Sequence, residues 1–184
     1  MEAFMSKVAL FIIDGFEEAE AVVTADLLRR ADVGLKIVSL SDKKEVLGKH
    51  NITVTADVLF NEVKNDIFDM LVIPGGTIKY IEHKGLLELV KKQHAAKRNL
   101  AAICAAPAVF GTAGILEGYK ATIYTGMRVY LGPGAVYEEE PVVTDRHITT
   151  SRGPGTSMAF GVRLIEILKG KDVADKIKED FLLK

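Results

Sequence analysis

Short apolar runs alternate along the chain with segments whose apolar positions recur every three or four residues. Three of these runs are continuous and consist largely of aliphatic residues: Lys7–Ile13, Asp69–Ile73 and Leu100–Ile103. A strand with one face in water would carry polar residues at alternate positions, so continuous runs indicate strands covered on both faces. Two further strands are predicted over Leu35–Leu40 and His147–Thr150.

Helical patterns separate these strands. Helical spacing of apolar residues, and proline as a favourable first helical residue, predict helices over Glu18–Ala31, Leu86–Lys97, Thr156–Leu168 and Val173–Phe181, with another starting near Pro107. Strands that alternate with helices indicate a parallel sheet with helices on both faces. We therefore predict an α/β fold, a three-layer α/β/α sandwich of flavodoxin-like type with a mainly parallel sheet, formed as a single domain over residues 1–184.

Four smaller features complete the predicted layout. The segment Glu45–Ala56 alternates apolar and polar residues and is predicted to form a hairpin. Ala121–Tyr124 and Val142–Val143 are further strand candidates. Thr156 or Ser157 is predicted to cap the helix that follows, because hydroxyl side chains can accept from the first free N–H groups of a helix.

Cys104 follows the strand Leu100–Ile103 and precedes the helix expected from Pro107. Ligands of open parallel sheets bind beyond the carboxyl ends of the strands, and Cys104 lies at such an end. A tight strand–turn–helix joint would present the thiol above the sheet edge, as in the nucleophile elbow of serine hydrolases. The positive amino end of the helix is predicted to lower the thiol pKa and make Cys104 nucleophilic. The alternative is a buried cysteine with only a structural role.

Gly75 and Gly76 follow the strand Asp69–Ile73 at the same predicted edge. Glycines at a strand end let backbone N–H groups approach an anion, because no Cβ intervenes. Together with the N–H of Ala105 they could form an oxyanion hole. An ordinary turn after Pro74 is the alternative.

Three glutamates, Glu17, Glu18 and Glu20, open the first predicted helix. Acidic residues are favoured there by the helix dipole alone, which is the alternative to a catalytic role. A carboxyl near a thiolate would have a raised pKa, because two negative charges resist sharing a site. Such a group could act as a general acid or base. The spacing by itself does not select one of the three.

The composition excludes several classes of protein. Lys and Arg number 24 and Asp and Glu number 25, so the net charge of −1 argues against a protein built mainly to bind nucleic acid. Four histidines without metal-ligand spacing and one cysteine cannot form a cysteine-rich zinc site. A lone cysteine favours a reducing cytoplasm. The first apolar run ends at Asp14, too short for a signal peptide or membrane span, so no membrane partner is expected.

Four segments together resemble motifs of the DJ-1/PfpI superfamily, in its DJ-1 branch rather than its protease-like branch. In chain order they are Glu17–Glu20, Ile73–Gly76, Ala101–Pro107 and Thr150–Ser157. The resemblance covers nearly the whole chain, from about residue 7 to residue 184. It implies the flavodoxin-like fold that is also called class I glutamine amidotransferase-like.

The resemblance also assigns roles to individual residues. Cys104 matches the reactive cysteine of the family, and Glu20 matches the glutamate that hydrogen-bonds it and would be the general acid/base. The other matches are backbone oxyanion donors and residues that line the site: Gly75, Gly76 and Ala105 for the donors, and Tyr124, Gly153 and Pro154 for the lining.

The function that the resemblance implies is a cysteine-dependent enzyme for reactive carbonyls, of the glutathione-independent glyoxalase or deglycase type. Its substrate would be a small carbonyl compound or a glycated protein, and neither a metal nor an organic cofactor is required. The resemblance also implies a homodimer. The helix Glu18–Ala31 supports this expectation, because its apolar residues exceed what one sheet face can cover.

Three other functions remain open. An oxidative-stress sensor or chaperone would use the same cysteine, with oxidation of Cys104 as its signal. A flavin-binding module is suggested by the fold alone. A peptidase or amidase is disfavoured, because the protease-like branch has a histidine where Ala105 stands. In many DJ-1 relatives a histidine also reaches the cysteine from the position that Tyr124 occupies here.

Overall fold

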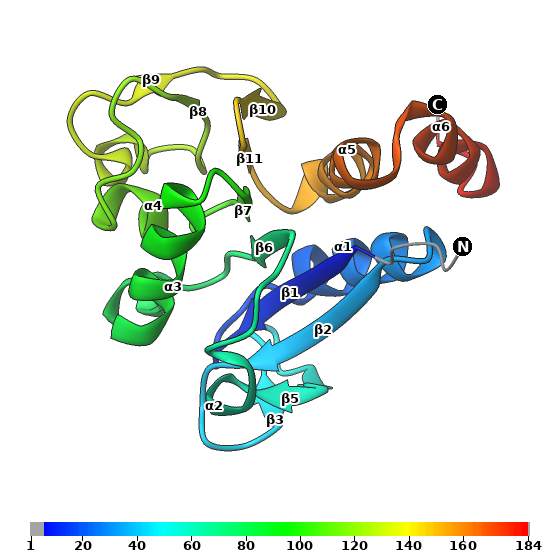
Figure 1. Ribbon diagram of the computed structural model, residues 1–184, viewed down its shortest axis with the longest axis horizontal. Coiled ribbons are helices and arrows are strands. Elements are labelled where there is room, and N and C mark those ends of the chain that lie inside the picture. The colour runs from blue at the N-terminus through cyan, green and yellow to red at the C-terminus, as the bar shows by residue number, and fades with distance from the viewer. Residues whose placement is uncertain (1–5, 184) are drawn as a thin grey trace.

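The computed structural model describes residues 6–183 and is organised around a seven-stranded sheet in the order β10-β11-β7-β6-β1-β2-β5 (Figure 1). Neighbouring strands run parallel, except that β10 and β11 are antiparallel. The strand bounds are Lys7–Ile12 (β1), Gly34–Ser39 (β2), Val58–Leu59 (β5), Met70–Ile73 (β6), Asn99–Ile103 (β7), Val142–Asp145 (β10) and Ile148–Ser151 (β11). The mainly parallel sheet predicted from the continuous apolar runs is confirmed, and β1, β6 and β7 are almost completely buried.

Helices cover both faces of this sheet, which confirms the three-layer sandwich (Figure 1). One layer holds α1, α5 and α6, which pack against one another, and the other holds α3 and α4. The helix bounds are Glu18–Arg30 (α1), Phe60–Val63 (α2), Lys84–Ala95 (α3), Pro107–Thr112 (α4), Ser157–Lys169 (α5) and Lys171–Asp180 (α6). Within residues 6–183, no helix is long and apolar enough to cross a membrane.

The strand order reverses beside β1. The chain builds outward from β1 through β2 to β5, and then returns to add β6 on the opposite side of β1. The carboxyl ends of adjacent parallel strands form a crevice at such a switch point, because the helices that follow leave toward opposite faces. The segments after β1, β6 and β7 therefore meet at one edge of the sheet.

The strand expected over Ala121–Tyr124 is wrong in extent. Only Lys120–Ala121 forms a strand (β8), and it pairs with Val136–Tyr137 (β9) in a separate two-stranded sheet. The next backbone groups bond elsewhere: the N–H of Thr122 donates to a threonine side chain, and that of Tyr124 donates to the carbonyl of Cys104. The apolar pattern continues to Tyr124, but hydrogen bonds to distant parts of the chain end the strand β8 at Ala121.

The predicted hairpin is confirmed, and the predicted helix cap is not. Glu45–Leu47 (β3) and Thr53–Thr55 (β4) pair as an antiparallel sheet of their own. Thr156 precedes α5, but its hydroxyl donates to the carbonyl of Gly153 at 2.9 Å and caps no helical N–H. Ser157 donates to the carbonyl of Pro154 at 2.8 Å. Both hydroxyls therefore stabilise the short 3₁₀ turn Pro154–Thr156 instead of the helix end.

Two other 3₁₀ turns are present, Lys79–Glu82 (η1) and Arg128–Leu131 (η2), and η2 packs very closely on α4. A Cβ built on Gly111 in α4 would lie 2.0 Å from the carbonyl oxygen of Tyr130. Because a backbone atom stands there, the contact cannot be relieved by a side-chain rotation. Only glycine lets η2 reach the helix that follows Cys104.

We predict that Gly111→Ala destabilises the protein by about 1–3 kcal/mol, the usual effect of overpacking a close contact. In an unhindered helix the same change would stabilise by about 0.5–1 kcal/mol, so the sign separates the two cases. The measurement is the midpoint of urea unfolding. Gly155→Ala is the control, since nothing lies within 4 Å of a Cβ at that position. An unchanged or higher midpoint for Gly111→Ala would contradict the packing argument.

Candidate active site

Cys104 lies directly after β7, in a left-handed backbone conformation with φ of 63°. Residues other than glycine rarely adopt this region, and holding one there costs about 1–3 kcal/mol. Two backbone hydrogen bonds of 2.9 Å fix the residue: its N–H donates to the Ser151 carbonyl, and its carbonyl accepts from the N–H of Tyr124. The predicted sharp joint between strand and helix is confirmed, and α4 begins at Pro107 as expected.

Glu20 lies in the first turn of α1 and is completely buried. Its Oε2 accepts a hydrogen bond of 2.6 Å from the N–H of Gly75. No N–H or O–H group of the described residues donates to Oε1. The thiol of Cys104 is the neighbour that interacts with this carboxyl.

Gly75 is the residue that Cys104, Ala105 and Glu20 all approach closely. A Cβ at this position would lie 2.7 Å from the Cβ of Cys104, 2.9 Å from the backbone nitrogen of Ala105 and 2.9 Å from Oε2 of Glu20. No real Cβ is found so close to such atoms, so any side chain would push these three groups apart. Gly75 therefore permits the approach of β6, β7 and α1 at the switch point.

The predicted oxyanion donors need a correction. The N–H of Gly75 already donates to Glu20, so it is not available to a substrate oxygen. The N–H groups of Gly76 and Ala105 both point at the sulfur of Cys104. Gly76 has a φ of 91°, and a Cβ there would lie 2.2 Å from the nitrogen of Glu17. Two of the three predicted amides therefore remain as candidate donors.

Burial dominates the ionisation of this pair. It raises the pKa of Glu20 to about 7, although the hydrogen bonds from Gly75 and Cys104 act in the opposite direction. The negative charge of Glu17 raises the pKa of Glu20 further, while Lys49 lowers it. A carboxyl with a pKa near 7 can both accept and return a proton at neutral pH.

The prediction of a lowered thiol pKa is wrong in direction. Burial, the charge of Glu20 and the hydrogen bond with Glu20 raise the pKa of Cys104 to about 12. The N–H groups of Gly76 and Ala105 lower it, but they do not outweigh the first three effects. The helix-end argument considered the local chain alone, whereas the opposing carboxyl comes from a distant segment. The two groups therefore titrate as a coupled pair.

Tyr124 adjoins the cysteine through its backbone, since its N–H donates to the Cys104 carbonyl, and its ring contacts Gly153. A Cβ on Gly153 would lie 3.3 Å from Cδ2 of Tyr124, so the ring packs closely against this glycine. Tyr124, Gly153 and Pro154 help to line a hollow of about 290 Å³. The Tyr124 side chain is about half exposed, and its hydroxyl bonds to no described group. Tyr124 thus lines this hollow, and among the described residues its hydroxyl does not bond to the thiol.

Glu17 and Glu18 lie at the same helix start but interact with the β3–β4 hairpin. Oε1 of Glu18 accepts from the N–H groups of His50 and Ile52, and Oε2 lies 3.0 Å from Nδ1 of His50. Potential metal-ligand atoms of Glu17, Glu18 and His50 lie within 4.8 Å of one another. Both carboxylate oxygens of Glu18 are already occupied by these hydrogen bonds. The cluster therefore serves to hold the hairpin on α1.

Two neighbours of Glu20 were not found by the sequence analysis as parts of this site. Tyr80 in η1 is fully buried, and its hydroxyl donates to the Phe11 carbonyl at 3.3 Å. Burial first, and then the charge of Glu20, raise the pKa of this phenol well above its usual value. Lys49 follows β3, and its N–H donates to the carbonyl of Phe16. Nothing in the local pattern around either residue points to Glu20.

Two of the four histidines lie together at the other end of the sheet. Nε2 of His147 and Nδ1 of His94 are 3.1 Å apart, and the ring of Tyr119 packs edge-on against both. His147 also accepts, through its carbonyl, from the N–H of Leu100 at the start of β7. Cys104 follows the opposite end of β7, so this pair has no part in the candidate site.

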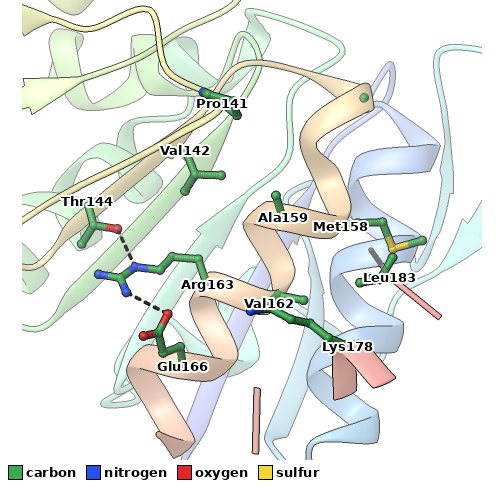
Figure 2. Close-up of a pocket in the computed structure, with 11 residues that line it drawn as sticks. Pro141, Val142, Thr144, Met158, Ala159, Val162, Arg163, Glu166, Lys178 and Leu183 are labelled. Atoms are coloured by element: carbon green, nitrogen blue, oxygen red, sulfur yellow. Dashed lines mark hydrogen bonds and ion pairs between the residues drawn. The ribbon is translucent and has the colours of Figure 1, made fainter. Parts of the chain in front are cut away.

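A larger hollow of about 690 Å³ lies between β10 and α5 (Figure 2). Arg163 crosses it, donating from Nε to Oγ1 of Thr144 at 3.1 Å and from Nη1 to Oε2 of Glu166 at 2.9 Å. Neither Cys104 nor Glu20 lines this hollow. Size alone would thus direct attention away from the residues with reactive chemistry.

An α/β/α sandwich with a cysteine elbow at its switch point, facing a buried carboxyl, defines a recognisable class of protein. The chain belongs to the DJ-1/PfpI family, whose model matches residues 6–167. The structure of Drosophila melanogaster DJ-1beta superposes with a TM-score of 0.95 at 30% identity, covering 98% of this chain and 100% of that one. The resemblance and the fold predicted from the sequence are both confirmed.

Curated relatives include proteins named for activities. DJ-1 homolog B of Arabidopsis thaliana is 39% identical over the whole chain, which spans only 43% of that protein's length. A glutathione-independent glyoxalase of Caenorhabditis elegans is 31% identical, covering 100% of this chain and 99% of the relative. A deglycase of Pyrococcus abyssi is 31% identical, covering 89% and 99% respectively.

We predict that alkylation of Cys104 stays slow through neutral pH and accelerates only as the pH approaches about 12, because burial and Glu20 raise the thiol pKa. Ionisation of Glu20 near pH 7 places a negative charge beside the sulfur, so it does not release the thiolate that attacks iodoacetamide. The measurement is the rate of iodoacetamide labelling from about pH 5 to 11, which is unambiguous because the chain has one cysteine.

Glu20→Gln is the matched variant, since it keeps the shape and removes the proton acceptor. Its labelling should shift to lower pH than in the wild type, because the charge and the hydrogen bond of Glu20 no longer raise the thiol pKa. It should still lie above the free-thiol value of about 8.5, because burial opposes the thiolate. A wild-type midpoint near 8.5, or the same pH dependence in both proteins, would refute coupling between the two groups.

Proposed function

We propose that the protein is a cysteine-dependent enzyme that converts α-oxoaldehydes such as methylglyoxal to 2-hydroxy acids without glutathione. The observation that carries this proposal is the buried Glu20 carboxyl, with its pKa raised to about 7, beside the thiol of Cys104. A nucleophile and a proton carrier in contact are the minimum that this chemistry requires. The fold brings them together from segments more than eighty residues apart.

In the first step the sulfur of Cys104 adds to the aldehyde carbon. The thiol proton passes to the Glu20 carboxylate, and the aldehyde oxygen becomes an oxyanion. The N–H groups of Gly76 and Ala105 are close enough to the sulfur to stabilise that charge. Return of the proton from Glu20 to this oxygen completes a hemithioacetal.

In the second step the Glu20 carboxylate removes the C–H proton of the former aldehyde carbon, and the electron pair moves toward the ketone to give an enediolate. The hydroxyl proton passes to the former ketone oxygen, and Glu20 returns its proton to the neighbouring carbon. The first carbon is oxidised and the second is reduced, so no external oxidant or reductant is needed. The product is a thioester of a 2-hydroxy acid on Cys104. Water then cleaves the thioester, which releases the acid and restores the thiol. In a deglycase reaction, the sulfur of Cys104 would add in the same way to the carbonyl carbon of a glycated amine.

Two relatives support this reading through their names, a glutathione-independent glyoxalase and a deglycase. Membership of the DJ-1/PfpI family supports it as well. A peptidase function has less support, because Ala105 follows the cysteine and Tyr124 offers no base to it. Glu20 is the titratable carboxyl in contact with the thiol.

A redox sensor is the second candidate function, and the contact between Cys104 and Glu20 is also what favours it. A protonated carboxyl beside an oxidised cysteine could donate a short hydrogen bond to a sulfinate oxygen. Turnover separates the two candidates, because a sensor needs oxidation and no steady-state product. A wild-type protein that forms sulfinate under mild peroxide but no lactate from methylglyoxal would favour the sensor.

We predict that Cys104→Ala abolishes lactate formation from methylglyoxal, and that Glu20→Gln lowers kcat by about 10²–10⁴-fold, as expected for loss of a general acid/base. Glu17→Gln is the control at the same helix start. It should keep most of the activity and move the rising limb of the pH profile to lower pH, because the charge of Glu17 raises the pKa of Glu20. Wild-type rates in Glu20→Gln would exclude the proton shuttle.

We also propose a homodimer that forms through α1 and the β3–β4 hairpin. Val22 on α1 and Leu47 and Ile52 on the hairpin are 49%, 44% and 57% exposed. The hydrogen bond from the N–H of Ile52 to Glu18 brings the hairpin against the first turn of α1. Exposed apolar side chains on adjacent elements are typical of a surface that another chain covers.

The test is light scattering at micromolar concentration. The wild type is expected at twice the mass of one chain, and Val22→Glu or Ile52→Glu should shift it toward one, because a buried charge would face the partner. Val129→Glu changes an apolar residue on η2 that is even more exposed, at 80%, and should leave the dimer intact. A wild-type monomer would overturn the proposal.

A further inference from the structure

Arg152 stands beside Cys104 in the fold. Ile103 of β7 is paired in register with Ser151 of β11, and Cys104 and Arg152 follow them directly. Adjacent strands lie about 4.8 Å apart, so the two residues leave neighbouring strand ends at the same edge. The hydrogen bond from the N–H of Cys104 to the carbonyl of Ser151 fixes this arrangement.

Arg152 lines the same hollow as Tyr124 and Gly153. Cys104 is not among the lining residues, but the hollow adjoins it, because Arg152 follows the neighbouring strand and the N–H of Tyr124 bonds to the Cys104 carbonyl. Nη2 of Arg152 donates to Oγ1 of Thr125 at 2.9 Å and lies 3.1 Å from Oε1 of Glu139. The side chain of Arg152 is 28% exposed, whereas that of Glu139 is 68% exposed. Thr125 therefore positions the guanidinium, and the carboxylate opposite it is an exposed surface group.

A carboxylate on a ligand could replace Glu139. Exposed ion pairs contribute little stability, because water screens them and both side chains lose freedom. Arginine has five N–H donors in a planar fork that matches a carboxylate. Within residues 6–183, the guanidinium of Arg152 contacts two side chains, those of Thr125 and Glu139. The volume of the hollow, about 290 Å³, suits a group of a few heavy atoms.

We propose that the hollow is a substrate subsite in which Arg152 binds a carboxylate, so that the preferred substrates are α-oxoaldehydes with a carboxylate at their far end. The inference rests on the proposed function, since it needs Cys104 to attack the aldehyde. A charge held by Arg152 binds a remote part of the substrate, and such binding raises kcat/KM for the substrate that carries it.

The reaction of such a substrate is balanced without any further reagent. In 4,5-dioxopentanoate the aldehyde carbon is oxidised, the neighbouring ketone carbon is reduced, and one water is consumed. The product is 2-hydroxyglutarate, and the carboxylate at the other end is unchanged. Its methyl ester has nearly the same shape and lacks the charge, which makes it the matched control substrate.

The experiment compares kcat/KM for 4,5-dioxopentanoate and its methyl ester. The wild type should prefer the carboxylate by about tenfold or more, the usual worth of a hydrogen bond to a charged group. Arg152→Gln should bring the ratio close to one. Glu139→Gln should raise the ratio, because it removes the competing carboxylate. This opposite change cannot arise from general damage to the fold.

Two control variants test the alternatives. Lys49 is the other cation that acts on Glu20, so Lys49→Gln must leave the ratio unchanged if Arg152 is the receptor. Arg163→Gln removes an arginine from the hollow in Figure 2 and should also have no effect on the ratio. A ratio near one in the wild type, or a ratio abolished by Lys49→Gln instead of Arg152→Gln, would overturn the proposal.

A binding measurement separates this proposal from the proposed function. Glutarate has two carboxylates and no aldehyde, and it should slow iodoacetamide labelling of Cys104 in the wild type but not in Arg152→Gln. If no substrate is turned over and glutarate still protects in this manner, the carboxylate site stands and the enzyme proposal falls. If glutarate protects neither protein and the wild type shows no preference, the site is refuted.

Discussion

The missing Cβ of Gly75 is the constraint on which the candidate site depends. At this one position the Cβ of Cys104, the nitrogen of Ala105 and the carboxyl of Glu20 all come within 3 Å of where a side chain would begin. The same residue donates its N–H to Glu20 at 2.6 Å. A single glycine thus admits the carboxyl and holds it. Without this approach the two reactive groups would lie apart, each with water or a separate partner.

The close packing around Gly75 also separates the parts of the site that the sequence predicts from the parts that it does not. The continuous apolar runs indicated buried parallel strands, and the ends of those strands led to Cys104 and Gly75. The use of the Gly75 amide could not be predicted, because it depends on how α1 is placed against β6. The predicted direction of the thiol pKa shift is wrong for a related reason. The helix end that lowers this pKa follows Cys104 directly in the chain, whereas burial and Glu20, which raise it, depend on the packing of distant segments. The extent of β8 was wrong because its next backbone groups bond to Thr150 and Cys104.

The strained backbone of Cys104 is stabilised by the same long-range packing. Its N–H bonds to β11 and its carbonyl to the segment that carries Tyr124, so two elements hold a conformation that the local chain would avoid. Those elements also build the hollow beside the site, with Arg152 following β11 directly. The backbone contacts that fix Cys104 therefore also fix the position of Arg152, the residue proposed to bind the far end of a substrate.

Whether the protein acts as an enzyme or as a sensor depends on where the shared proton lies at rest. Oxidation by peroxide requires a thiolate before any substrate arrives. A carbonyl enzyme requires only that the proton can move as the carbon–sulfur bond forms. Burial opposes both ionised groups, and the charge of Glu20 opposes a thiolate further, so the proton rests on sulfur once Glu20 is ionised. Such a resting thiol reacts slowly with peroxide but passes its proton to Glu20 when an aldehyde is in place. The electrostatics of the pair therefore favour turnover over sensing.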